Sequence, residues 1–292
     1  MTTPDNGPVI AGVDGGASGT DALVLGRWAA EVLDVPLVVA VVHPAPGGGA
    51  GRVDAEWIAD RHRAAEAVLN GARTVLTDAP GPVSYRAVAS SSASHGLHDL
   101  AEELGAQAIV VGSGRSAPPM RLFAGSTAER LLAGSFCPIA VAPAGMRTPP
   151  GSLGRIGVAY IDTADGRAAL ATAAALAART GSPVRLYAVI SDNDTTLPPL
   201  IGEDTERAFE SLARDTFEAR LQEAAASIPD IEVDFEIRTG NVVDTLADLD
   251  DVDVLFCGSR GYGPARRVLL GGVSTKLMRR AKRPVVVVPR SG

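Results

Sequence analysis

The sequence has few cysteines, and it lacks the patterns typical of secreted, membrane-spanning and nucleic-acid-binding proteins. Its two cysteines, Cys137 and Cys257, each adjoin an apolar, strand-like run, so we expect buried thiols and no disulfide. The first residues show no basic start followed by an apolar stretch, which argues against a secretory signal. No apolar run approaches the roughly 18 residues that span a bilayer. We therefore expect a cytoplasmic protein that does not contact membranes.

Charge and histidine content exclude two further kinds of site. The formal net charge of −7 does not suit a protein that binds nucleic acid, because such proteins neutralise phosphates with a basic face. The four histidines all lie in the first half of the chain. His95 and His98 share a helical face, but neither a cysteine nor a third histidine accompanies them, so we expect no metal site.

An internal repeat determines the predicted architecture. When residues 94–143 are placed over residues 240–289 without a gap, 11 of the 50 aligned positions are identical, against roughly three or four expected by chance. The identical pairs include Gly112 with Gly258. The parts that precede these windows also match, with Leu23 paired to Leu170. The chain is therefore a duplication of one domain.

Each half alternates short β-branched runs with longer helical patterns, which indicates a parallel sheet wrapped by helices. We predict an α/β fold of two tandem, doubly wound, Rossmann-like domains, each with five parallel strands in the order 3-2-1-4-5. The predicted domains are residues 1–143 and 155–292, joined by a Pro- and Gly-rich linker at 144–154. The expected strands are 9–14, 37–42, 83–88, 108–111 and 139–142, then 155–160, 184–190, 231–237, 252–257 and 285–288. The expected helices are 18–33, 54–77, 95–104 and 126–134, then 165–179, 203–227, 241–249 and 273–282.

Candidate binding residues fall at one end of the first predicted sheet. In a doubly wound sheet, ligands bind beyond the carboxyl ends of the strands, where the strand order reverses. Asp14 ends the first strand, the segment Gly112-Ser113-Gly114-Arg115 follows the fourth, and Gly125-Ser126 opens a helix. Glycines let backbone N–H groups approach a phosphate closely, and a helix N-terminus offers unpaired donors. Glycine is also common in turns after strands, so this pattern alone leaves a phosphate site and an ordinary turn equally open.

Taken together, the two halves resemble the universal stress protein family. That family carries an aspartate at the end of its first strand and, after the fourth, Gly, two residues, Gly, nine residues, Gly and then Ser or Thr. The resemblance implies an ATP site, with the aspartate on the nucleoside and the glycine loop and its hydroxyl on the ribose and phosphates. The matching positions are Gly112, Arg115, Gly125 and Ser126 in the first half and Gly258, Gly261, Gly271 and Gly272 in the second.

The two halves depart from the family pattern differently. In the first, Arg115 replaces the second glycine and Gly114 stands one step earlier; a shifted turn at Gly114 avoids backbone strain, and Arg115 is able to pair with a phosphate. In the second, Ile161 replaces the aspartate and Gly272 replaces the hydroxyl. Losing a charge-assisted hydrogen bond costs about 1.5–3 kcal/mol, and the adjacent Asp162 points to the opposite face of the strand. We therefore expect weak ATP binding, mainly in the first half.

Three more features favour ordinary structural roles. His43 lies at the end of the second strand, where the family's adenine packs, but a surface turn is favoured over a base contact. The basic residues between Arg266 and Arg283 favour a solvated helix face over a surface that steers anions. Ser90–Ser92 lacks the Gly-x-Ser-x-Gly elbow and ordered base of a catalytic serine.

The leading hypothesis is a tandem universal stress protein: a stress-response regulator that binds adenine nucleotide and reports it to an unknown protein partner without catalysis. The alternative is a nucleotide-free interaction or scaffold protein of the same fold. An adenine-nucleotide hydrolase or a flavin-binding relative is disfavoured, because no carboxylate pair or metal-ligand cluster accompanies the glycine loop.

The fifth strand of each predicted sheet is an edge without internal charge, at residues 139–142 and 285–288. Such an edge exposes unpaired backbone groups and invites association. In the family, single-domain members dimerise through this strand. The resemblance therefore implies that the two halves of this chain pair as an intramolecular pseudo-dimer, and it leaves a homodimer of the whole chain open.

Overall fold

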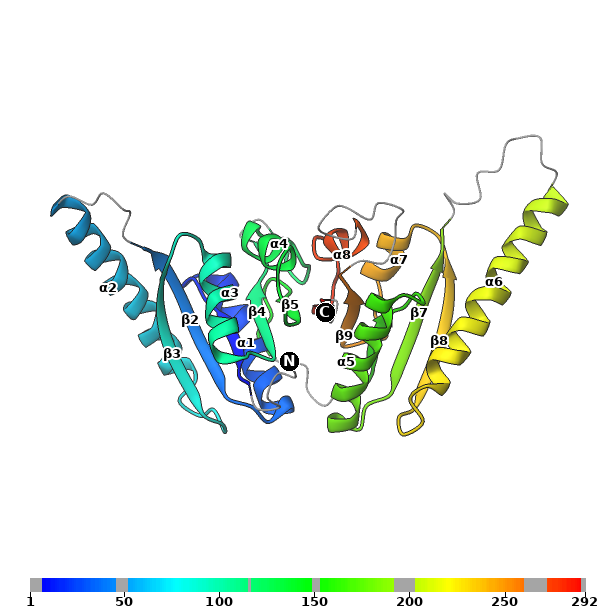
Figure 1. Cartoon of the computed structure of the whole chain (residues 1–292), viewed down its shortest axis with the longest axis horizontal. Coiled ribbons are helices and arrows are strands. Elements are labelled where there is room, and N and C mark those ends of the chain that lie inside the picture. The colour runs from blue at the N-terminus through cyan, green and yellow to red at the C-terminus, as the bar shows by residue number, and fades with distance from the viewer. Residues whose placement is uncertain are drawn as a thin grey trace. The chain divides into compact units, whose positions relative to one another are not determined.

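The computed structural model describes residues 7–45, 52–114, 117–148, 153–191, 203–259 and 272–289, without the side chains of residues 52–55, 203–210 and 213. The chain folds as two compact units, Met1–Gly151 and Ser152–Gly292, which we call unit 1 and unit 2 (Figure 1). The predicted linker at 144–154 spans the junction, and its residues 149–152 lie outside the described residues.

Strands and helices alternate along both units. In unit 1 the elements are β1 (Val9–Gly12), α1 (Ala17–Leu33), β2 (Leu37–Pro44), α2 (Arg52–Val75), β3 (Val83–Ser90), α3 (Ala93–Leu104), β4 (Ala108–Gly112), α4 (Ser126–Leu132) and β5 (Ile139–Ala142). In unit 2 they are β6 (Ile156–Ala159), α5 (Ala164–Thr180), β7 (Val184–Ile190), α6 (Glu203–Ala226), β8 (Val233–Thr239), α7 (Val242–Ala247), β9 (Val254–Gly258), α8 (Gly272–Leu277) and β10 (Val285–Val288).

The predicted fold class is confirmed. Within unit 1 the strand order is β3-β2-β1-β4-β5, and within unit 2 it is β8-β7-β6-β9-β10, which is the order 3-2-1-4-5 in each. The central strand β1 runs parallel to both neighbours, with Val9 opposite Leu37 on β2 and Ala108 on β4. The pairing of the two fifth strands with each other stays a prediction.

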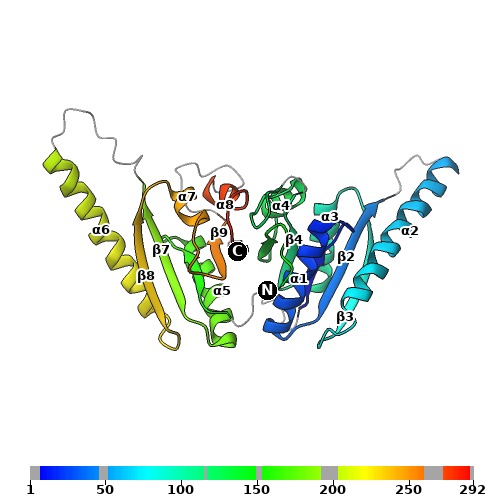
Figure 2. The ribbon, with the colours of Figure 1, turned by 180° about the vertical axis from the view of Figure 1, so that it is seen from behind.

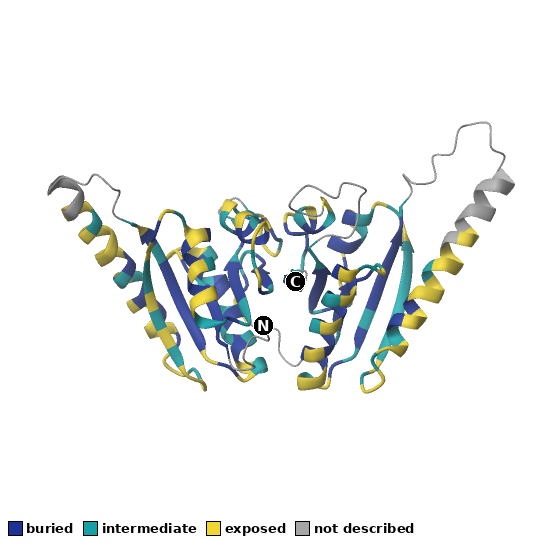
Figure 3. Ribbon diagram, viewed as in Figure 1, coloured by how far each residue is buried: buried dark blue, intermediate teal, exposed yellow. Residues whose placement is uncertain are grey.

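Two helices cover each face of the unit 1 sheet. A right-handed crossover places α1 and α2 on one face and, because the strand order then reverses, α3 and α4 on the other. The two opposite views show α3 in front of this sheet in one and α1 in front in the other (Figures 1 and 2). The strands between these layers form the buried core, with Val9 and Ile10 fully inaccessible (Figure 3).

The helices before the fifth strands are shorter than predicted. The predicted spans 126–134 and 273–282 end at Leu132 in α4 and Leu277 in α8. After these residues the chain tightens into i→i−3 hydrogen bonds, from the N–H of Gly134 to Leu131 O at 3.2 Å and from the N–H of Arg280 to Leu277 O at 3.0 Å. A final turn of this kind is common where a helix stops.

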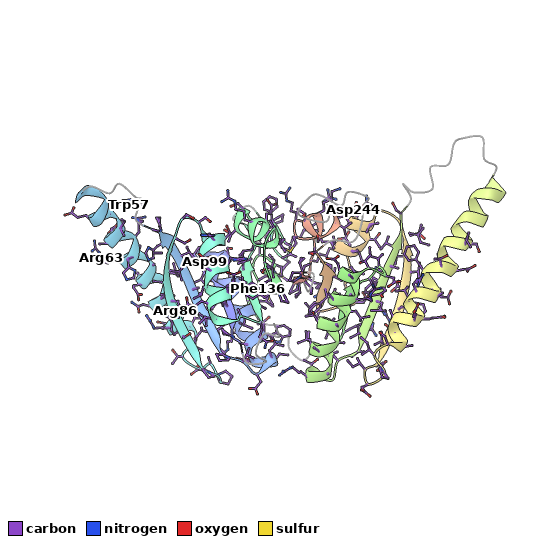
Figure 4. All side chains as sticks on the ribbon, viewed as in Figure 1. Trp57, Arg63, Arg86, Asp99, Phe136 and Asp244 are labelled. Carbon is purple, nitrogen blue, oxygen red and sulfur yellow. The ribbon has the colours of Figure 1, made fainter. Side chains whose placement is uncertain are left out.

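Figure 4 draws the side chains on the ribbon and labels Arg86 and Asp244, two charged residues that form ion pairs. Arg86 on the edge strand β3 forms an ion pair with Glu103 of α3 at 3.1 Å, and Arg280 forms one with Asp244 of α7. Charges on an edge strand discourage unwanted strand pairing.

No helix among the described residues is long and apolar enough to cross a bilayer.

Candidate functional site

A cavity of about 480 Å³ opens at the carboxyl ends of β1 and β4 in unit 1. This volume lies in the range of small-molecule pockets. The cavity also lies where the strand order reverses, since β1 leads to β2 on one side and pairs with β4 on the other. Its lining residues are Gly12, Val13, Asp14, Ser18, Gly19, Ala40, Val41, Val42, Ala93, Leu97, Val111, Gly112, Ser113, Gly114, Gly125, Ser126, Thr127 and Ala128.

Most of the residues proposed from the sequence for the first half meet in this cavity. Those that line it are Asp14, Gly112, Ser113, Gly114, Gly125 and Ser126. Of the others, Gly258 ends β9 in unit 2, whereas Arg115, Gly261 and Gly271 lie outside the described residues.

Asp14 is held in a turn that leads directly into α1. Its Oδ1 accepts a hydrogen bond from the backbone N–H of Gly16 at 2.9 Å, and Gly16 is the N-cap residue of α1. The carboxylate is exposed at the mouth of the cavity. Ser18, in the first turn of the same helix, also lines the cavity. Strand β1 ends at Gly12, so Asp14 lies in the turn after it and not at the strand end predicted from the sequence. Sequence reasoning missed Ser18, which stands four residues after Asp14 in the first turn of the helix.

We call residues 112–126 the glycine loop, of which the structure describes all but residues 115 and 116. Ser113 connects the two ends of this loop. The Ser113 Oγ–H donates to the carbonyl O of Ala142 at 2.8 Å, and the same Oγ accepts from the Phe123 N–H at 3.2 Å. A Cβ placed on Gly125 would lie 3.6 Å from the Gly114 Cα. The two glycines therefore bring bare backbone from both ends of the loop to the cavity wall.

The packing of α1 on β4 requires glycine at position 112. A Cβ added to Gly112 would lie 1.9 Å from the carbonyl O of Ser18, a distance at which backbone must move. This close approach sets Ser18 against the strand end and narrows the cavity between the helix and the glycine loop.

The wall formed by β2 and α3 is apolar, with Ala40, Val41, Val42 and Leu97. His43 follows on β2 but does not line the cavity. It is only 8% exposed, and its Nε2 lies 3.2 Å from the Nδ1 of His62 on α2. The surface-turn reading of His43 was therefore wrong, because a partner 19 residues away shields the ring.

In unit 2 a carboxylate stands at the position equivalent to Ser18. α1 and α5 both have 17 residues, so Asp165, the second residue of α5, corresponds to Ser18. Asp165 is 7% exposed, and its Oδ1 accepts a hydrogen bond from the Oγ–H of Ser259, just after β9, at 3.0 Å. Sequence reasoning missed this role, because an aspartate in the first turn of a helix is ordinarily explained by the helix dipole.

Asp162 has different partners. Its carboxylate forms ion pairs with Arg167 of α5 and, at 3.4 Å, with Arg220 of α6. These residues line a separate cavity of about 640 Å³ between α5 and α6. Asp162 therefore does not stand in for the aspartate that Ile161 replaces.

The remaining reactive residue types form no further centre in the part of the chain that the structure describes. No group of three or more His, Cys, Asp or Glu residues there is placed to hold a metal ion. Both cysteines are free and buried, as predicted. Burial raises the pKa of the Cys137 thiol to about 11 and that of Cys257 to about 12, so both stay protonated and unreactive at neutral pH.

Comparisons with known proteins give one consistent answer. The model of the universal stress protein family matches the chain twice, over residues 6–143 and 153–289. Universal stress proteins of Mycobacterium tuberculosis and Mycobacterium bovis are each 32% identical over 293 residues, which cover 96% of this chain and 99% of theirs.

Solved structures share the whole two-unit fold. A universal stress protein from Archaeoglobus fulgidus matches with a TM-score of 0.65 and 18% identity, covering 99% of this chain and 98% of its own. A functionally unknown protein from Pseudomonas aeruginosa matches with a TM-score of 0.65 and 14% identity, covering 97% of this chain and 92% of its own. At these identities the likeness concerns the fold alone.

Proposed function

Because this chain belongs to the universal stress protein family, with two such domains in tandem, we propose that it binds one adenine nucleotide, in the cavity of unit 1, and acts as a regulator rather than an enzyme. The observation that carries this proposal is the contrast between the two crevices. Ser18 lines the cavity of unit 1, whereas in unit 2 a buried carboxylate, Asp165, stands at the same position and bonds Ser259.

The residues around the unit 1 cavity suit the parts of a nucleotide. The exposed Asp14 carboxylate is an acceptor for the hydroxyls of a ribose, and charge-assisted hydrogen bonds of this kind are strong. Gly125 and Ser126, at the start of α4, present backbone and a hydroxyl to the cavity, where glycine allows a phosphate oxygen to come close. The apolar wall of Val41, Val42 and Leu97 is a surface for the flat face of a base.

The same geometry opposes a phosphate in unit 2. A buried carboxylate repels a second anion in a site of low polarity, and the repulsion is stronger than in water. The Ser259 hydroxyl already donates to Asp165, so it is not available to a phosphate. Ile161 supplies no acceptor for a ribose. Unit 2 therefore binds no nucleotide and serves as a structural partner of unit 1.

Native mass spectrometry of the purified protein tests the proposal most cheaply. We expect one ATP per chain, and none in Asp14→Ala. An equal share of chains carrying two ATP molecules would contradict it. A second measurement addresses catalysis: Asp14 is the one carboxylate among the described residues that line the cavity, and no described group is placed to hold a metal ion, so steady ATP hydrolysis should stay below about 1 s⁻¹, the low end of ordinary enzymes. A faster rate that Gly125→Ala abolishes would make the protein an ATPase.

A further inference from the structure

The residues that follow β5 are held by the two elements that line the unit 1 cavity. We call residues 143–146 the exit turn, since the chain leaves unit 1 here. The Ala144 N–H donates to Arg121 O at 3.1 Å, and the Met120 N–H donates to Ala144 O at 2.8 Å. The Gly145 N–H donates to Oδ2 of Asp21 on α1 at 2.9 Å. The exit turn is thus bonded both to the glycine-loop segment and to the first helix.

On the loop side, the bond to the exit turn holds an unfavourable backbone conformation. Met120 has φ 56°, one of two positive values among the described non-glycine residues. Such a residue is uncommon and persists only where its surroundings over-determine it. The Met120 side chain is 56% exposed, so side-chain packing does not fix the conformation. The backbone hydrogen bonds of Met120 and Arg121 with Ala144 are contacts that hold this segment in place.

On the helix side, a buried carboxylate makes the connection. Asp21 is 2% exposed, and its Oδ1 has no hydrogen-bond partner. Burial raises the pKa of this carboxyl, and the N–H of Gly145 opposes that rise. Asp21 and the cavity-lining Ser18 are three residues apart on α1, so they lie on the same helix face. A half-satisfied buried carboxylate is costly, and the backbone of Gly145 and Met146, together with the positive charge of Arg147, offsets part of that cost.

We infer that residues 117–125 of the glycine loop and the exit turn at 143–146 open and close as one cooperative unit, so that a ligand that orders the loop also orders the start of the chain leading to unit 2. The identity of the ligand rests on the proposed function, whereas the coupling of loop and turn does not. By linkage the effect is reciprocal: a substitution that loosens the exit turn must lower the affinity of the protein for the ligand.

Hydrogen exchange of the full chain without ligand tests the coupling directly. Asp21→Ala removes the bond to Gly145, and α5 has Ala168 at the equivalent position, so the helix accommodates alanine there. We expect peptides covering 117–125 and 141–148 both to exchange about fivefold faster. Should this variant not fold, Asp21→Asn keeps an acceptor for the Gly145 N–H but weakens the bond by removing its charge, so exchange of the two peptides should again change in the same direction and by a similar factor. Arg27→Ala is the matched control on the same helix, since Arg27 bonds Glu31 and Asp78 O instead; it should leave both peptides unchanged.

If residues 141–148 exchange faster while residues 117–125 keep the parent rate, the inference is wrong. Added ATP provides a second arm: exchange of 141–148 should slow about fivefold, and Asp21→Ala should weaken ATP binding by the same factor. ATP that binds without protecting 141–148 contradicts the coupling. A parent chain that binds no ATP contradicts the proposed function instead, and the ligand-free comparison then decides the coupling by itself.

Discussion

Unit 1 and unit 2 have the same strand order and the same helix lengths at their first helix, yet their crevices differ at the residue that faces the fourth strand. In unit 1 that residue is Ser18, which borders a cavity. In unit 2 it is Asp165, which bonds Ser259 across the crevice. The duplicated fold therefore carries different side chains at equivalent places beside the fourth strand, a serine in unit 1 and a buried, hydrogen-bonded carboxylate in unit 2.

The second helices also differ in how they meet the loop before the first helix. In unit 1 the contact is apolar, and a Cβ on Gly15 would lie 2.8 Å from Val68 of α2. In unit 2 the contact is the ion pair between Asp162 and Arg220 of α6. Since this pair is partly exposed, it contributes little to stability. Asp162 and Arg220 both line the cavity between α5 and α6.

The largest expected effect separates the two strand ends. Gly112→Ala forces a methyl group against the Ser18 carbonyl, 1.9 Å away, whereas at Gly258 the nearest backbone atom, Asp165 O, is 2.7 Å away. Overpacking typically lowers the free energy of unfolding by 1–3 kcal/mol. We therefore expect Gly112→Ala to lower it by about 3 kcal/mol and Gly258→Ala to lower it clearly less. Chemical denaturation of both variants measures this. Equal losses would mean that the helices pack equally closely in the two units.

A double substitution should give unit 2 the site that it lacks. Asp165→Ser removes the blocking carboxylate, and Ile161→Asp restores the acceptor found at Asp14. A charge-assisted hydrogen bond contributes about 1.5–3 kcal/mol, or roughly 10- to 150-fold in affinity. We expect the double variant to bind a second ATP, and Ile161→Asp alone to bind only one. Calorimetric stoichiometry distinguishes these results, and a double variant that still binds one ATP would show that Asp165 does not block the crevice.

The sequence predicted the fold well because its signals were local. Buried parallel strands such as Val285–Val288 are continuous apolar runs, and the repeat supplied each element twice. The sequence placed Asp14 and the glycines at the carboxyl ends of β1 and β4, and there they line one cavity, but their use in binding a ligand stays a prediction. Asp165 and the His43–His62 pair were missed because their roles depend on partners 94 and 19 residues away, which no local pattern encodes.

A fall in pH should change the stability of the two units in opposite directions. Burial raises the pKa of Asp21, so this carboxyl takes up a proton at a higher pH in folded unit 1 than in the unfolded chain. Unit 1 therefore gains stability as the pH falls from neutral toward about 4. Hydrogen bonds from Arg185 lower the pKa of Asp234, so unit 2 loses that stabilisation as the pH falls below about 4. The Asp234 side chain is 45% exposed, which limits its share to less than about 1 kcal/mol.

Unit-resolved hydrogen exchange at pH 7 and pH 3.5 measures this smaller effect. Unit 2 should open first in acid, and Arg185→Gln should reduce its sensitivity to acid. Asp21→Asn should remove the gain in unit 1. The opposite order of opening at pH 3.5 would show that other carboxylates dominate.

Titration calorimetry of the parent chain with ATP tests the central claim most directly. One site per chain is predicted, with a dissociation constant that Asp14→Ala raises at least tenfold and that Asp162→Ala leaves unchanged, because Asp162 faces Arg167 and Arg220. Two equivalent sites, or binding that survives Asp14→Ala, would contradict the assignment of the nucleotide to unit 1.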